Sequence, residues 1–185
     1  MGFYLSVLPQ RLPLFSAYRM CAENLDSRAP LEAMTPPPPG LRPALLVFHV
    51  NDNTDDQVLF QAACKQANVP FHWHVAESAE RGVSYFNSLL ALSQTRSVRW
   101  PDLVVLDIVM PEGSGLKVLE FIRSTPKLKS LPVVMLTGHS SPEMQVASLK
   151  LGANSFYEKP SDFAQLVQLV RALYDIWSAA RRPQL

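Results

Sequence analysis

From residue 44 onward the chain alternates between short apolar runs and longer segments that are typical of helices. Most of the short runs are rich in Val and Leu, which is typical of strands buried on both sides of a sheet. The predicted strands are Ala44–Val50, Phe71–Ala76, Leu103–Leu106, Val133–Leu136 and Asn154–Tyr157. The predicted helices are 54–67, 78–94, 114–124, 141–151 and 161–180. This alternation predicts an α/β fold, a single doubly wound five-stranded parallel sheet with five helices on its two faces.

Local signals mark where several of these helices begin. Thr54 and Gln57 match a capping box at the start of the first helix. Asp55 and Asp56 then lie in its first turn, where the helix dipole favours acidic side chains. Ser141, followed by a proline, is expected to begin the fourth helix. We therefore interpret Asp55 and Asp56 as charges that stabilise a helix start.

Proline marks the boundary of the folded part. Eight of the 16 prolines lie in residues 1–43, four of them in a row. Such a run favours extended polyproline II and cannot continue a helix or enter a sheet. We interpret 1–43 as a disordered N-terminal extension, 44–180 as one domain and 181–185 as a short tail. Met34 is an alternative start of translation.

Composition narrows the class of protein. The chain has 48% hydrophobic and 18% charged residues, which is enough apolar material for a core. No apolar stretch reaches the roughly 18 residues that a membrane-spanning helix needs. The formal net charge of +1 argues against a nucleic-acid-binding surface. Because Cys21 and Cys64 cannot form a disulfide framework, we expect a reducing, cytoplasmic setting and no membrane association.

Polar side chains follow the ends of four predicted strands. Asn51 and Asp52 follow the first strand, Asp107 the third, Thr137 the fourth and Lys159 the fifth. The carboxyl ends of parallel strands form one edge of a sheet, where ligands bind in folds of this kind. Two nearby carboxylates need a cation between them, and Mg²⁺ prefers such oxygen ligands. With an ammonium and a hydroxyl beside them, a carboxylate could act as a nucleophile toward a phosphoryl group.

Four segments carry a resemblance to the receiver domains of response regulators. They are VNDNTDD (Val50 to Asp56), LVVLDIVMPEGSG (Leu103 to Gly115), PVVMLTG (Pro132 to Gly138) and LGANSFYEKP (Leu151 to Pro160). They occur in the family's order and with fitting spacing, and the resemblance covers about residues 41–180. It implies a flavodoxin-like receiver fold with strand order 2-1-3-4-5.

The resemblance implies a role for each residue near the phosphoacceptor. Asp107 would accept a phosphoryl group from the phosphohistidine of a sensor histidine kinase or a phosphotransfer protein. Mg²⁺ would be bound by Asp52, Asp107 and the backbone carbonyl of Val109. Asn51 stands where the family usually has an acid, so its contact with the metal would be weak or mediated by water. We therefore predict weaker Mg²⁺ binding than in an Asn51→Asp variant.

The last two segments would bind the transferred phosphoryl group and change conformation in response to it. The resemblance implies that Thr137 and Lys159 bind the phosphoryl group. Thr137 and Phe156 would form the conformational switch. The Lys159–Pro160 peptide bond would be cis, as it is in the family.

These expectations favour a single-domain response regulator of a two-component phosphorelay. Because only 25 residues follow Pro160, we expect signalling through surfaces of the receiver itself and not through an effector domain. No turnover of a free substrate is expected. One alternative is a pseudo-receiver that binds partners without phosphorylation, which Asn51 favours. The other is a small phosphatase with an aspartyl nucleophile, although Ile108 and Val109 break its usual D-x-D-x-T string.

Partner surfaces are predicted on the last helix. Leu169 and Ile176 lie outside its core-facing stripe and widen the apolar arc. Either Arg171 or the C-terminal tail partly covers these residues, or they form a homodimer or partner surface. A looser resemblance links the chain to stand-alone receivers that include partners of bacterial phytochromes. A phytochrome-type sensor kinase is therefore a candidate donor.

Overall fold

The computed structural model describes residues 44–111 and 113–180. The predicted extension 1–43 and tail 181–185 lie outside the described residues. The strands are β1 (Leu45–Val50), β2 (Phe71–Ala76), β3 (Leu103–Leu106), β4 (Val109–Met110), β5 (Gly113–Ser114), β6 (Val133–Thr137) and β7 (Ser155–Glu158). The helices are α1 (Thr54–Ala67), α2 (Ala79–Leu92), α3 (Gly115–Ser124), α4 (Pro142–Lys150) and α5 (Phe163–Ala180).

Five of the strands form one sheet in the order β2-β1-β3-β6-β7, and all neighbouring strands are parallel. This confirms the predicted α/β fold and the strand order 2-1-3-4-5. β4 and β5 form a separate two-residue antiparallel pair in the loop after β3, which the sequence did not predict. A pair this short leaves no periodic pattern.

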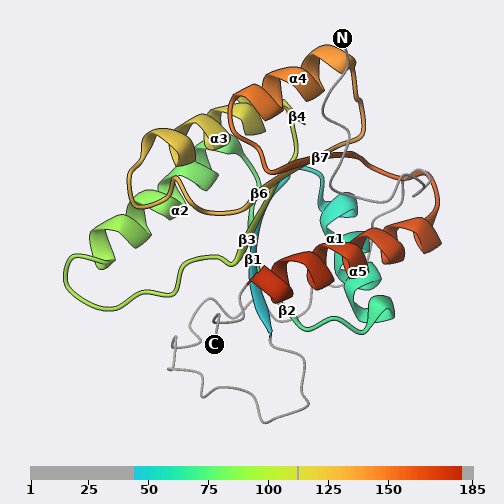
Figure 1. Cartoon of the computed structure of the whole chain (residues 1–185), viewed down its shortest axis with the longest axis horizontal. Coiled ribbons are helices and arrows are strands. Elements are labelled where there is room, and N and C mark those ends of the chain that lie inside the picture. Colours follow the sequence, from blue (N-terminus) through green and yellow to red (C-terminus); the bar gives the residue numbers. More distant parts are fainter. Residues whose placement is uncertain (1–43, 112, 181–185) are drawn as a thin grey trace.

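The helices cover both faces of the sheet (Figure 1). One core contains residues of α1 and α5, together with Leu45 and Val47 of β1. The other contains residues of α2 and α3, together with Phe48 and Val50 of β1. All six residues of β1 are buried, as expected for a strand covered on both sides. The sheet is thus covered by helices on both faces, and its carboxyl edge is left for loops that can present functional groups.

α1 begins differently from the prediction. Its N-cap is Asn53, whose side-chain oxygen accepts hydrogen bonds from the backbone N–H groups of Asp55 (2.9 Å) and Asp56 (3.2 Å). The predicted cap at Thr54 is therefore wrong, because Thr54 is already the first helical residue. Asp56 becomes the third residue of the helix. The predicted cap at Ser141 is confirmed.

α5 buries a wider arc than predicted. Leu169 is 1% exposed and belongs to the core shared with α1, while Ile176 is half-buried. Because α5 packs along α1, Leu169 is not available for the expected homodimer surface. The exposed large hydrophobic side chains of the described residues lie elsewhere, at Val109, Val146 and Leu149.

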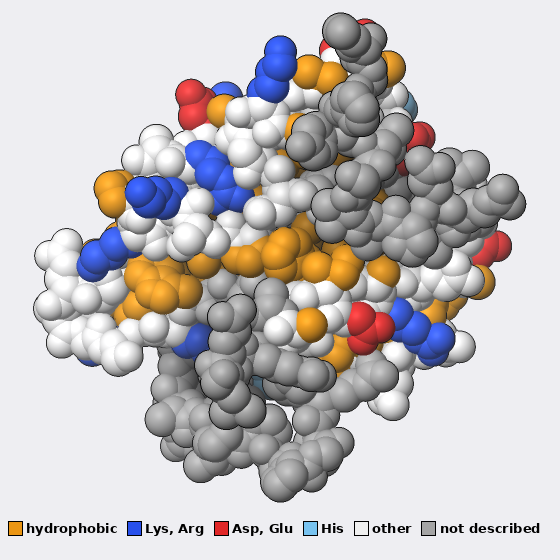
Figure 2. Space-filling view, viewed as in Figure 1, with side chains coloured by type: hydrophobic (Ala, Val, Ile, Leu, Met, Phe, Trp, Pro, Cys, Tyr) orange, Lys and Arg blue, Asp and Glu red, His pale blue; other side chains and the backbone are white. Residues whose placement is uncertain are grey.

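The surface seen in Figure 2 carries charges of both signs. Lys and Arg side chains are found mainly over the side where α2 and α3 lie, and acidic side chains are scattered over the view. No helix within residues 44–111 and 113–180 combines the length and the apolar character needed to cross a membrane.

A buried histidine in β1 makes the fold sensitive to acid. His49 is 1% exposed and lies against the rings of Phe60 and Trp73. Burial, with a smaller contribution from the charge of Lys159, lowers the pKa of His49 to about 3. Below its ordinary pKa of about 6.5 the unfolded chain binds a proton that the folded chain does not bind. The free energy of unfolding therefore falls as the pH decreases from about 6.5 toward 3.

We expect His49→Leu to remove this acid-dependent loss. Between about pH 7.5 and about pH 5.5 the native chain should lose about 1.4 kcal/mol more stability than the variant. Urea unfolding at both pH values measures the difference. His72→Leu is the control, because His72 is exposed on β2. An equal loss in the native chain and in His49→Leu would contradict the prediction.

Candidate phosphoacceptor site

Asp107 lies immediately after the buried strand β3 and is 5% exposed. Its backbone N–H donates to the carbonyl of Val50 (2.9 Å), which continues the sheet, and its Oδ1 accepts from the N–H of Val109 (3.2 Å). Gly115 passes so close that a Cβ there would lie 2.0 Å from the carbonyl oxygen of Asp107. Only glycine permits this approach, which explains its place in the motif. The loop thus holds one carboxylate at the sheet edge.

Lys159 follows the edge strand β7 and contacts Asp107, which follows the central strand β3. Its N–H donates to the carbonyl of Thr137 (2.7 Å), and its Nζ forms ion pairs with Oδ2 of Asp107 and Oδ2 of Asp56. The side chains of Lys159 and Asp107 are 8% and 7% exposed, and that of Asp56 is 25% exposed. Burial raises the pKa of Asp107, while the Lys159 ammonium opposes this effect. A buried carboxylate is therefore kept beside a fixed positive charge.

Thr137 and Phe156 occupy the neighbouring strands. Thr137 ends β6 and is fully buried, and its hydroxyl donates to the carbonyl of His139 (3.1 Å). Phe156 in β7 is half-buried and packs against the core on the side of α2 and α3. Phe156 also lines a shallow pocket of about 300 Å³ next to the start of α4, and the other lining residues are Ser140, Ser141, Pro142, Gln145 and Glu158. The two predicted switch residues thus lie on adjacent strands beside the loop that leads to α4.

Asn51 is fixed by its own loop. It is fully buried, its Oδ1 accepts from the N–H of Asn53 (2.8 Å), and its Nδ2 donates to Oδ2 of Asp56 (3.5 Å). Asp52 follows it and is half-exposed. Of the predicted residues, the structure brings Asp107 and Lys159 into contact and links Asn51 to them through Asp56. The sequence pattern predicts a helix-start charge at Asp56 and not a site residue. The sequence signal for a further acid at the site is Asn51, which stands where the family usually has an acid.

The donor atoms at this edge fit Mg²⁺. Mg²⁺ is usually bound through one or two carboxylates and keeps several water ligands. Asp52 and Asp107 follow the neighbouring strands β1 and β3, and together with the backbone carbonyl of Val109 they would supply donors of this kind. Within residues 44–111 and 113–180, no cluster of three or more His, Cys, Asp or Glu side chains is arranged to hold a metal ion. A cation here would therefore depend on two carboxylates, a carbonyl and water.

One expectation about the backbone is wrong. The described part of the chain contains no cis peptide bond, so the Lys159–Pro160 bond is trans. Trans is the lower-energy isomer even before proline.

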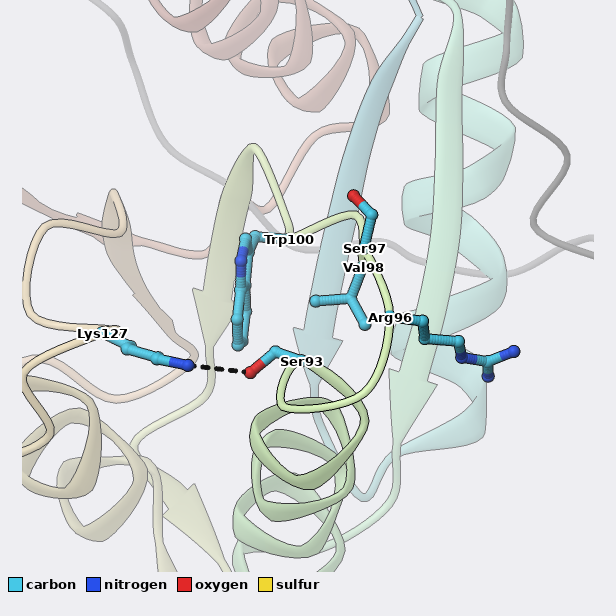
Figure 3. A pocket seen from close by; sticks show the side chains of 6 residues that line it. All are labelled: Ser93, Arg96, Ser97, Val98, Trp100 and Lys127. Carbon is cyan, nitrogen blue, oxygen red and sulfur yellow. Dashed lines mark hydrogen bonds between the residues drawn. The ribbon is translucent and has the colours of Figure 1, made fainter.

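A second pocket lies at the opposite edge of the sheet. It has a volume of about 310 Å³ and is formed by the end of α2, the loop before β3 and the segment after α3 (Figure 3). Lys127 Nζ donates to Ser93 Oγ there (3.1 Å). Trp100 in this pocket precedes β3, whereas Asp107 follows it. The pocket is therefore separate from the phosphoacceptor site. Its lining residues are Ser93, Arg96, Ser97, Val98, Trp100 and Lys127.

Known proteins resemble this chain to different extents. The phosphate regulon transcriptional regulatory protein PhoB of Klebsiella pneumoniae is 36% identical over 74 residues, which are 40% of this chain and 32% of PhoB. The chain thus matches only about a third of that relative's length. Response regulator Rcp1 of Synechocystis sp. is 26% identical over 135 residues, 73% of this chain and 90% of Rcp1.

Solved structures show the same fold. The phosphorylated cyanobacterial phytochrome response regulator RcpA superposes with a TM-score of 0.65 at 27% identity, over 76% of this chain and 98% of RcpA. The Mn²⁺-bound form of Rcp1 superposes with a TM-score of 0.58 at 23% identity, over 75% and 97%. The family model "response regulator receiver domain" matches residues 50–171. This chain therefore belongs to the receiver-domain family of response regulators.

Proposed function

We propose that this receiver domain is a phosphorylation switch whose phosphoacceptor is Asp107. The observation that carries the proposal is the buried carboxylate of Asp107 paired with the Lys159 ammonium at the carboxyl edge of the sheet. Asp107 follows the strand at the centre of the sheet, between β1 and β6. Ligands of doubly wound folds bind at this edge.

The chemistry is a transfer between two nucleophiles. An oxygen of Asp107 attacks the phosphorus of a phosphohistidine, the P–N bond breaks, and the imidazole leaves with its electron pair. The product is an acyl phosphate on Asp107. Lys159 supplies a positive charge next to the attacking carboxylate, and that charge stabilises the phosphoryl oxygens. When bound, Mg²⁺ would neutralise further negative charge, and Asp52, Asp107 and the carbonyl of Val109 would hold it.

Thr137 couples the new group to the surface. Its hydroxyl donates to His139 in the described state, and it would turn to a phosphoryl oxygen on Asp107. The loop between β6 and α4 would then rearrange next to Phe156. Because Phe156 lines the pocket beside Ser140 and Ser141, its movement would alter the surface of α4 and β7. Signalling would therefore be a population shift between two surfaces.

The partner class follows from this chemistry and from the relatives. A sensor histidine kinase or a phosphotransfer protein would supply the phosphoryl group. The similarity to RcpA and Rcp1 supports a phytochrome-type kinase. We place the protein in the cytoplasm, without nucleic-acid binding. Association of two copies through α5 stays a prediction. Ile176, which is half-buried, could take part in such an interface, whereas Leu169 is buried in the core.

Acetyl phosphate tests the proposed function directly. After incubation with acetyl phosphate and Mg²⁺, we expect the intact mass to increase by one phosphoryl group, and we expect no increase in Asp107→Asn. The control is Asp175→Asn, an exposed acid on α5, which should be modified like the native chain. An adduct that persists in Asp107→Asn would contradict the proposal. The absence of any adduct, and of any response to beryllofluoride, would favour the pseudo-receiver that Asn51 suggests.

A further inference from the structure

Asp56 contacts the site through two separate partners. Its Oδ2 forms an ion pair with Lys159 Nζ and accepts from Asn51 Nδ2 (3.5 Å). Lys159 bridges it to Asp107. Its neighbour Asp55, one residue earlier in α1, is exposed, whereas Asp56 is the residue that reaches Lys159. A helix-start charge alone does not explain why Asp56 reaches the site.

The charges at the site suggest what Asp56 does. Receiver domains usually have an acid where Asn51 stands. Because Asn51 carries no charge, only Asp52 and Asp107 would oppose the positive charge of Lys159 if Asp56 were absent. Counting Asp52 as the proposed metal ligand, the site with Asp56 would hold three carboxylates and one ammonium, a formal charge of −2. That is the value which an acid at position 51 would give without Asp56. Because Asp56 is only 25% exposed, solvent screens its charge incompletely.

We infer that Asp56 supplies the carboxylate that Asn51 lacks, and that it positions Lys159 against Asp107. This inference rests on the proposed function, since it concerns the same site. Asp56 is a positioning residue, and in the described structure it acts through Lys159 and Asn51. The Asn51 amide could not pair with the ammonium as a carboxylate does. Lys159 instead forms its ion pair with Asp56, which is five residues after Asn51 and is the third residue of α1.

The arrangement also defines a role during phosphorylation. Lys159 is shared between two carboxylates, so it can move its hydrogen bonds toward the phosphoryl oxygens without leaving its ion pair with Asp56. Asp56 thus keeps the ammonium within reach of the reaction in both states. Removing Asp56 would leave Lys159 held by Asp107 alone and would reduce the attraction of the site for a divalent cation.

The test compares four variants of the full chain: Asp56→Asn, Asn51→Asp, the two combined, and Asp55→Asn as the matched control. The first readout is the dissociation constant for Mg²⁺, measured with Mg²⁺ alone through the amide resonances of Asp107 and Val109. We expect Asp56→Asn to weaken binding about tenfold, which is the effect of a nearby unit charge. We expect Asp55→Asn to change it by less than about twofold. The double variant should return to within about threefold of the native value, because the charge is restored.

The second readout is the side-chain resonance of Lys159 without Mg²⁺. It should shift in Asp56→Asn, stay in place in Asp55→Asn and return toward its native position in the double variant. Where the native chain binds Mg²⁺, Asp56→Asn behaving like Asp55→Asn in either readout would overturn the inference, as would a double variant without recovery. Should no form bind Mg²⁺, the Lys159 resonance decides alone. Neither readout requires phosphorylation, so an Asp107 that never accepts a phosphoryl group would defeat the proposed function without affecting this result.

Discussion

Replacing Lys159 with methionine is expected to lower the free energy of unfolding by about 3 kcal/mol. The Lys159 side chain is 8% exposed and is paired with two carboxylates. Methionine fills a similar volume but leaves Asp56 and Asp107 next to each other without a cation. Removing one partner of a buried ion pair typically costs about 3–5 kcal/mol. We expect the lower end, because Asp56 is partly exposed. Urea unfolding near pH 7.5 without Mg²⁺ measures the loss.

The same variant should respond to acid and to metal in defined directions. Burial already raises the pKa of Asp107, and without Lys159 this pKa rises further. The folded variant then binds a proton more readily than the unfolded chain, so its loss of stability should become smaller as the pH falls. Mg²⁺ should also restore part of the loss. Lys127→Met is the control, since Lys127 is exposed and donates to Ser93. An equal loss in both variants would contradict the prediction.

The residues at the sheet edge could be predicted because parallel strands place their carboxyl ends together. Asp107, Thr137 and Lys159 come from three strands, and only their positions after apolar runs were needed to bring them to one edge. The contact between Lys159 and Asp107 follows from this topology. The direction of the Thr137 hydroxyl does not, because it depends on the path of the loop that contains His139.

The helix-start pattern does not predict the contact between Asp56 and Lys159, because the position of Asp56 depends on where α1 begins. With the cap at Thr54 it would be the second residue of the helix, and with the cap at Asn53 it is the third. One position rotates a helical side chain by about 100°, enough to turn it toward or away from Lys159. Asn53 and Thr54 are both good capping residues, so the sequence pattern alone does not choose between them.

Leu169 shows a second limit of sequence patterns. The period of apolar residues predicts which face of a helix is buried, but it does not give the width of the buried arc. That width depends on the neighbouring helix, here α1, whose contact with α5 covers Leu169. The residues that remain exposed, Val146 and Leu149 on α4, could not be distinguished from core residues in the sequence.

Val109→Asn is expected to shorten the lifetime of the phosphorylated state about tenfold. Hydrolysis of the acyl phosphate needs a water molecule aligned with the breaking P–O bond. Val109 is two residues after Asp107 and 51% exposed, and its side chain offers such a water no hydrogen bond. Asparagine would orient the water without acting as a base. Its effect should therefore lie below the roughly 10²- to 10⁴-fold of general acid–base catalysis. The decay of the adduct mass after removal of acetyl phosphate measures the lifetime.

Val146→Asn is the control that tests whether the effect depends on the position of the asparagine. Val146 on α4 is 50% exposed, so the same substitution changes the polarity of the surface to a similar extent there. Its phosphorylated lifetime should equal that of the native chain, and Val109→Leu, which also lacks a polar group, should keep the slow decay. None of these substitutions removes the backbone N–H of Val109 that donates to Asp107 in the native chain. The comparison therefore isolates the side chain next to the phosphoryl group. A native lifetime of seconds that Val109→Asn leaves unchanged would show that another group already orients the water, and His139 in the loop after β6 would be the next residue to test.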